Sequence, residues 1–128
     1  MVWAFLLLCI IDLRKVVLVI CLIVVSCKID TQDVVLSGYI YDSESEKPIP
    51  NATLKIENWY YGNSPDESYT GYGLYDLTTD ERGFYSVNLD TSAMINIWVI
   101  KEGYQKEFKS EKRPIKNEKI NVYLKRVN

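Results

Sequence analysis

Histidine is absent from the 128 residues of this chain. It is the commonest general base near neutral pH and the commonest protein ligand for metal ions, so its absence excludes Ser-His-Asp and Cys-His catalysis. We therefore expect no catalytic residue and no metal site of the usual kinds.

Cysteine is scarce and confined to one end of the chain. The three residues are Cys9, Cys21 and Cys27, and the 101 residues that follow contain no thiol for a disulfide or a cysteine-ligated metal. A body of about 100 residues buries enough apolar surface to fold without cross-links. We expect packing alone to stabilise it, with no cofactor.

The sequence also lacks an uninterrupted apolar run of the roughly 20 residues that a membrane-spanning helix needs. Residues 2–11 and 16–25 are apolar, but Asp12, Arg14 and Lys15 separate them. Each charge near the middle of a joined span would cost about 2.5–3.5 kcal/mol on insertion scales. A basic pair, an apolar run and a small residue are instead typical of a secretory signal peptide.

The signal ends in Val-Val-Ser-Cys at residues 24–27, which resembles the bacterial lipobox. The resemblance implies cleavage before Cys27 and lipid attachment to its sulfur, with two or more acyl chains holding the protein on a membrane. Residues 1–26 are then the signal peptide and 27–33 a lipidated tether. The alternatives are an ordinary signal that ends in a buried cysteine, and a translation start at Leu13.

Residues 28–30, Lys-Ile-Asp, are similar to the acidic segment that follows the lipidated cysteine in some lipoproteins of the Bacteroidetes. The similarity implies a bacterial cell-envelope protein that is lipid-anchored in the outer membrane. It leaves open whether the body lies on the periplasmic or the surface face.

Charge is unevenly distributed, although the formal net charge is only −2. Residues 27–100 contain 4 Lys/Arg and 12 Asp/Glu, net −8, whereas residues 101–128 contain 9 and 4, net +5. The basic end is suited to an anionic partner such as lipid headgroups or nucleic acid. Lysine alternates with glutamate there and no aromatic series accompanies it, which favours solvated strand faces and argues against nucleic acid.

Alternating apolar residues predict β-strands throughout residues 34–126. The expected strands are 35–42, 52–57, 74–79, 84–89, 94–101, a short one ending at Phe108, and 120–125, with a basic loop at 109–117. We predict an all-β, seven-stranded antiparallel sandwich of Ig-like or transthyretin-like type, because helical periodicity is lacking.

Two turn-and-strand units organise this body. In the first, Ala52, Leu54 and Ile56 share one face of a strand that follows two prolines. In the second, residues 79–83 form a turn in which the Asp80 carboxylate accepts backbone N–H groups and the glycine takes a positive φ. Both units are expected to place their apolar face in one core.

Residues 57–73 combine turn-forming composition with five aromatic side chains. Such rings provide rigid, amphipathic contact area in binding loops, but they also cap sandwiches or extend hairpins, so both interpretations stay open. The candidate ligand contacts are Trp59, Tyr60, Tyr61, Tyr69 and Tyr72.

The order of the turn motifs resembles that of the carboxypeptidase regulatory-like domain, a transthyretin-like sandwich, over residues 34–126. The residues that carry the resemblance are Gly38, Pro48, Ala52, Thr79, Asp80, Gly83, Gly103 and Tyr104. The resemblance implies a non-catalytic accessory module with a carbohydrate-binding-like fold. Related hydroxyisourate hydrolases depend on histidines and an Arg-Gly-Ser ending, which this chain lacks.

Three functions compete at this point. The first is a membrane-anchored binding module for a glycan or an envelope protein, and the second is an assembly subunit that pairs by its sheet edge. The third is a hydrolase that uses adjacent carboxylates, at residues 66–67 or 80–81. Adjacent strand residues point to opposite faces, so we predict that the protein is not an enzyme.

Overall fold

The computed structural model describes residues 13–18, 20 and 29–128. Residues 13–18 are helical, and the predicted lipidation site, Cys27, lies outside the described residues together with most of the predicted signal peptide. Within the described ranges, no helix has both the length and the apolar character needed to span a membrane.

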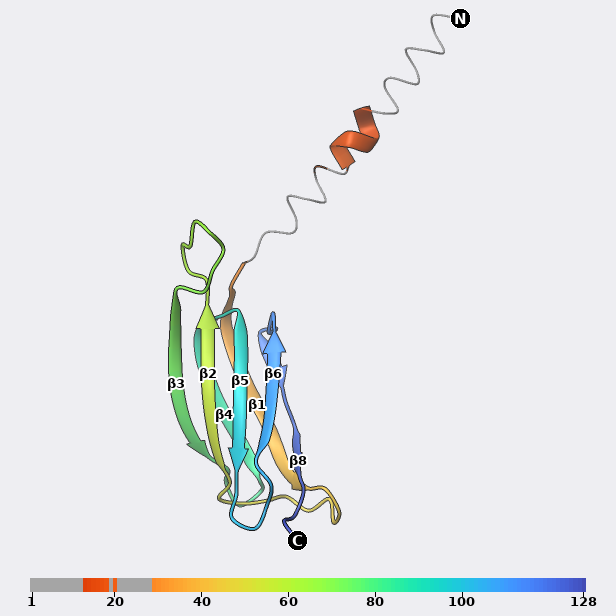
Figure 1. The fold of residues 1–128 in the computed structure, drawn as a ribbon, viewed down its shortest axis with the longest axis vertical. Coiled ribbons are helices and arrows are strands. Elements are labelled where there is room, and N and C mark those ends of the chain that lie inside the picture. The colour runs from red at the N-terminus through yellow and green to blue at the C-terminus, as the bar shows by residue number, and fades with distance from the viewer. Residues whose placement is uncertain (1–12, 19, 21–28) are drawn as a thin grey trace, which may run out of the picture.

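Two β-sheets face each other to form the body (Figure 1). One has the order β4-β1-β7, with β8 also paired to β1, and the other has the order β3-β2-β5-β6. The strands are β1 (Thr31–Asp42), β2 (Thr53–Tyr60), β3 (Gly71–Thr78), β4 (Phe84–Ser92), β5 (Met94–Ile100), β6 (Glu107–Lys112), β7 (Asn117–Lys119) and β8 (Val122–Leu124). The predicted all-β sandwich is confirmed.

The core lies between the sheets and uses every second residue of the strands. On β2, Leu54 and Ile56 are buried while Lys55 between them is exposed, as the alternation predicts. Burying a large aliphatic side chain stabilises the fold by roughly 1.5–3 kcal/mol. The completely buried aliphatic residues are Val34, Leu36, Ile40, Ala52, Leu54, Ile95, Ile97, Val99, Val122 and Leu124.

The last predicted strand differs from the observed structure in two ways: it is divided into two short strands, and these run parallel to their neighbour. β7 and β8 pair in parallel with β1, in place of one antiparallel strand. A Cβ at Gly38 would collide with the carbonyl of Ile120, so the two backbones approach closely at this glycine. Between the two short strands, Ile120 N donates to Ser37 O at 2.9 Å and Asn121 Oδ1 accepts from Tyr39 N at 2.9 Å.

Two segment boundaries also differ from the prediction. β6 occupies part of the predicted basic loop, with Lys109 opposite Ile97 of β5. The prediction ended this strand at Phe108, because the residues that follow it in β6, Lys-Ser-Glu-Lys, lack apolar alternation. At the other end, β1 begins at Thr31, so the last residues of the predicted tether belong to the strand.

The residues of the turn motifs meet at the end of the sandwich opposite the chain entry (Figure 1). Thr79 Oγ1 accepts from Ala52 N at 2.9 Å and donates to Ile49 O at 2.8 Å. Asp80 accepts from the backbone N–H groups ahead of it, and Gly83 has a φ of +72°, as predicted. Pro48 forms an isolated bridge with Tyr41 of β1.

A buried carboxylate joins the C-terminal segment to this end. Asp42 Oδ2 accepts from the Tyr104 hydroxyl at 2.8 Å and from Arg126 Nε at 2.7 Å. Its Oδ1 accepts from Glu44 N and Ser45 N. The Ser45 N–H, the Tyr104 hydroxyl and Arg126 together hold the pKa of Asp42 well below its usual range. Beside it, Gly103 O accepts from Val127 N at 2.9 Å.

Candidate functional site: an aromatic face on one sheet

Four of the predicted contact residues come together where β2 ends and β3 begins. Trp59 of β2 stacks on Tyr72, its register partner on β3, with ring centroids 4.8 Å apart and planes at 27°. Tyr69 lies 6.1 Å from Trp59 and stacks on Tyr61 at 4.7 Å and 14°. We call Trp59, Tyr61, Tyr69 and Tyr72 the aromatic cluster.

Tyr60 lies apart from this cluster. It follows Trp59 on β2, so its side chain points to the opposite face of the strand. Its ring covers Gly71, its register partner, where a Cβ would collide with the phenol. The structure therefore brings together four of the five candidate contact residues and places Tyr60 on the opposite face of its strand.

Hydrogen bonds order the loop of residues 61–70. The hydroxyls of Ser64 and Ser68 donate to Asp66 Oδ1 at 2.6 and 2.7 Å, and they lower the pKa of Asp66 to about 2. Thr70 Oγ1 donates to Tyr61 O at 2.6 Å across the base of the loop. The loop tip is therefore both constrained and negatively charged at neutral pH.

Asp30, which directly precedes β1, also holds the loop of residues 61–70 in place. Asp30 Oδ1 accepts from Tyr61 N at 2.7 Å, and Asp30 Oδ2 accepts from Gly62 N at 2.8 Å. The loop that carries part of the aromatic cluster is thus fixed directly to the residue that precedes β1. No local pattern indicates this contact, because it joins positions 31 and 32 residues apart.

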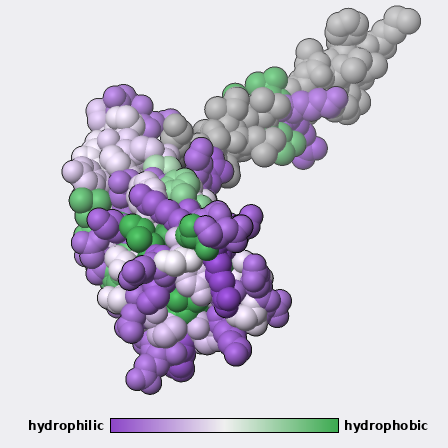
Figure 2. Space-filling view, turned by 60° about the horizontal axis from the view of Figure 1, so that its bottom comes forward, coloured by the Kyte–Doolittle hydropathy of each residue, from purple (hydrophilic) through white to green (hydrophobic). Residues whose placement is uncertain are grey.

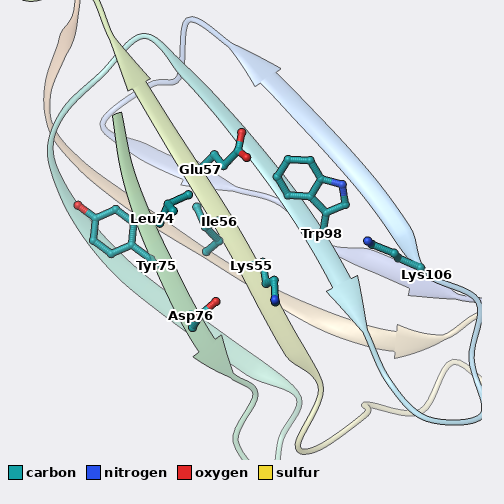
Figure 3. A pocket seen from close by; sticks show the side chains of 8 residues that line it. All are labelled: Lys55, Ile56, Glu57, Leu74, Tyr75, Asp76, Trp98 and Lys106. Atoms are coloured by element: carbon teal, nitrogen blue, oxygen red, sulfur yellow. The ribbon is translucent and has the colours of Figure 1, made fainter. Parts of the chain in front are cut away.

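A shallow groove lies along the outer face of the β3-β2-β5-β6 sheet (Figure 3). Glu57 and Leu74, which line it, are each two residues along their strand from a member of the aromatic cluster. The groove encloses about 330 Å³. Within it Leu74 is 67% exposed, and the Trp98 ring packs on Phe108 of β6 with centroids 5.0 Å apart. The lining residues are Lys55, Ile56, Glu57, Leu74, Tyr75, Asp76, Trp98 and Lys106.

Charged side chains lie among these apolar surfaces. Lys55 faces Asp76 on β3 and Trp98 on β5 in the strand register. Trp59 Nε1 donates to Glu57 Oε2 at 3.1 Å, so this carboxylate links the aromatic cluster to the groove. Flat rings bordered by hydrogen-bond donors and acceptors are suited to ligands with both apolar faces and polar edges.

The carboxylate pairs considered for hydrolysis lie in turns outside the groove. Asp66 is hydrogen-bonded to the serines of its own loop, and Asp80 accepts from backbone groups of its own turn. In the ranges that the structure describes, no group of three or more His, Cys, Asp or Glu is arranged to hold a metal ion.

The comparisons with known proteins identify a fold and no family. The sequence matches no known protein family and no curated protein. Catechol 1,2-dioxygenase from Acinetobacter sp. ADP1 gives a TM-score of 0.57 at 15% identity, over 77% of this chain and 54% of its own. Catechol 1,2-dioxygenase from Acinetobacter radioresistens gives 0.58 at 11% identity, over 77% and 53%. A variant of the shaft pilin SpaA from Lactobacillus rhamnosus GG gives 0.54 at 13% identity, over 77% and 47%.

This chain therefore spans about half the length of the solved chains that it resembles. At these identities the similarity shows a shared β-sandwich fold alone, because one fold supports many unrelated functions.

The same comparisons correct one prediction. We expected that the chain is not an enzyme, partly because the resembling domain is an accessory module. Catechol 1,2-dioxygenases are enzymes with the same type of sandwich, so that prediction was wrong to exclude catalysis on this fold. Their low identity assigns no activity to this chain.

Proposed function

We propose that this chain is a lipoprotein of the bacterial cell envelope, anchored in the outer membrane through lipid on Cys27, whose sandwich binds a glycan at the aromatic cluster. The lipobox-like sequence before Cys27 supports the anchor. The order of turn motifs along residues 34–126 supports a carboxypeptidase regulatory-like module.

Glycan binding rests on the exposure of the clustered rings. Tyr72 is 57% exposed and Tyr69 is 36% exposed, although both stack on neighbouring rings. The rings also brace the hairpin, since Trp59 and Tyr72 are directly opposite each other. The rings keep exposed surface although they brace the hairpin, and an exposed aromatic ring can stack on the apolar face of a sugar.

The groove beside the cluster offers polar groups for sugar hydroxyls. Lys55, Glu57 and Asp76 come from adjacent strands and line the same outer face (Figure 3). A glycan that stacks on Trp59 would extend along the groove toward Trp98. This geometry favours an extended chain of several sugars over a single small molecule.

A glycan array tests this proposal with the full chain in detergent micelles. Trp59→Ala with Tyr72→Ala is expected to abolish binding of the glycans that wild-type protein retains. Tyr39→Ala with Tyr41→Ala is the matched control, because it removes another stacked pair, with centroids 5.9 Å apart, from the other sheet. Equal loss in both variants, or binding that survives in the first, contradicts the proposal.

A specific observation favours a second candidate, assembly through the β3 edge. β3 ends its sheet and carries one charged residue, Asp76, in eight positions. β6, at the other edge of the same sheet, carries four: Glu107, Lys109, Glu111 and Lys112. Charged edge strands resist pairing with other chains, and β3 lacks that protection. An envelope partner would add a strand along β3.

Site-specific photocrosslinking in cells distinguishes this candidate. A photoreactive residue at Leu74 is expected to crosslink to one defined protein, and the same residue at Lys109 of β6 is not. Crosslinks from both positions, or from neither, contradict assembly through β3.

A further inference from the structure

The chain enters the sandwich at one end of its long axis, beside the loop of residues 61–70 (Figure 1). The two hydrogen bonds from Tyr61 N and Gly62 N to Asp30 fix that entry point. Cys27 precedes Asp30 by three residues, which span at most about 11 Å when fully extended. A lipid on Cys27 therefore keeps this end of the body close to the bilayer.

Exposed apolar side chains gather at this end. Ile29 is 77% exposed and Ile115 is 63% exposed, and Tyr69 adds a partly exposed ring. We call Ile29, the loop 61–70 and the loop 113–116 the tether-end surface. Exposed isoleucine and tyrosine side chains at the end of a protein that faces a bilayer favour partition of that end into the headgroup layer.

The loop 113–116 is built to present Ile115 outward. Arg113 N donates to Ala93 O at 3.0 Å and Val35 N donates to Lys116 O at 2.6 Å, so both ends of the loop are attached to the body. Ile115 N itself donates to Glu118 Oε2 at 3.1 Å. An exposed aliphatic residue between Arg113 and Lys116 is suited to an anionic lipid surface, where cations and apolar groups bind together.

The opposite end has a different character. Its turns, residues 43–47, 80–83 and 101–106, hold none of the exposed large apolar side chains of the described body, and Val127, which is 57% exposed, lies beside them. They carry five acidic residues, Glu44, Glu46, Asp80, Glu81 and Glu102, and four basic ones, Lys47, Arg82, Lys101 and Lys106. Figure 2, turned so that this end comes forward, shows it mainly hydrophilic. These turns therefore offer no exposed large apolar side chain for the headgroup layer to bury.

We infer that the sandwich stands upright on the bilayer, with the tether-end surface resting on anionic lipid headgroups and the turns of residues 43–47, 80–83 and 101–106 directed away. This orientation rests on the lipid anchor proposed above. Asp66 and Glu67 lie in the loop 61–70 while Arg113 and Lys116 flank Ile115, so the closest lipid contact lies under the loop 113–116. The aromatic face then stands beside the membrane, and a glycan reaches it parallel to the surface.

Fluorescence quenching in vesicles tests the orientation. The full chain is reconstituted into vesicles of phosphatidylethanolamine and phosphatidylglycerol that contain a lipid with a nitroxide near its headgroup. An environment-sensitive dye is attached at Ile115→Cys or, as the matched control at the opposite end, at Ser45→Cys. Cleavage before Cys27 removes Cys9 and Cys21, and lipidation blocks the sulfur of Cys27, so lipidated wild-type protein has no free thiol. Wild-type protein that takes up no dye therefore confirms that Cys27 is lipidated.

The result expected is strong quenching of the dye at position 115 and none at position 45. Equal quenching at both positions, or none at 115 in protein that floats with the vesicles, overturns the orientation and leaves the anchor intact. Wild-type protein that takes up the dye at Cys27, or that fails to float with vesicles, overturns the anchor itself and the orientation with it.

Discussion

Arg126 Nε lies 2.7 Å from Asp42 Oδ2, although the two residues are 84 positions apart in the chain. The Asp42 side chain is 3% exposed and that of Arg126 is 55% exposed, so a half-exposed cation covers a buried anion. The contact attaches the segment after β8 to the end of β1. It closes the sandwich at the end opposite the tether.

We expect the free energy of unfolding to decrease as the pH falls through the acidic range. The folded-state pKa of Asp42 lies below its unfolded value, because the Ser45 N–H, the Tyr104 hydroxyl and Arg126 stabilise the carboxylate. The unfolded state therefore binds more protons in acid, so this stabilisation is complete above the unfolded pKa and is lost as pH falls toward the folded pKa.

Urea unfolding between about pH 2 and 6 measures this dependence. Asp42→Asn is expected to flatten it, and Arg126→Gln, which removes one of several donors, to give an intermediate slope. A slope in Asp42→Asn that equals the wild-type slope would show that other groups cause the acid sensitivity.

Gly38→Ala is expected to destabilise the protein by about 1–3 kcal/mol, the usual cost of overpacking a filled interior. The added Cβ would meet the carbonyl of Ile120, which accepts from the Tyr85 hydroxyl, while the N–H of the same residue donates to Ser37 O. Gly73→Ala is the control, because its Cβ would lie 3.2 Å from the Tyr75 ring, a side chain that can shift. Urea denaturation of both variants measures the difference, and equal effects would contradict it.

The fold was predictable from the sequence wherever a local pattern determines it. The alternation of Leu54 and Ile56 and the turn chemistry of Asp80 and Gly83 are properties of neighbouring residues, and the structure confirms both. The extension of β6 beyond Phe108 and the parallel pairing of β7 and β8 were not predictable. An edge strand has no need of an apolar face, and the direction of pairing depends on long-range contacts.

The candidate site was predictable only in part, for the same reason. The aromatic richness of residues 57–73 indicated a surface, and the shared face of Leu54 and Ile56 placed Lys55 on the opposite side of its strand. Neither pattern contains the strand register, which sets Lys55 opposite both Trp98 and Asp76. The groove therefore appears only when three strands are paired.

Thr79→Val is expected to cost about 1–3 kcal/mol of unfolding free energy, because it leaves two buried backbone groups without partners. The hydroxyl bridges Ala52 N and Ile49 O, and the residue is 3% exposed. Valine has nearly the same volume, so the effect isolates the hydrogen bonds. Thr79→Ser retains the hydroxyl and is expected to lose less in the same urea titration. Equal losses in the two variants would assign the cost to packing.

Asp30→Ala is expected to loosen the loop of residues 61–70 without unfolding the sandwich. Its carboxylate is the acceptor for Tyr61 N and Gly62 N, and the loop is mostly exposed, so the change acts on local order rather than on the core. Hydrogen exchange by mass spectrometry should show faster exchange at these two amides and unchanged exchange in β5. Asp76→Ala, which removes a carboxylate from the same hairpin, is the control. Unchanged exchange of the loop in Asp30→Ala would mean that the aromatic cluster holds the loop by itself, and that the tether and the candidate site are mechanically independent.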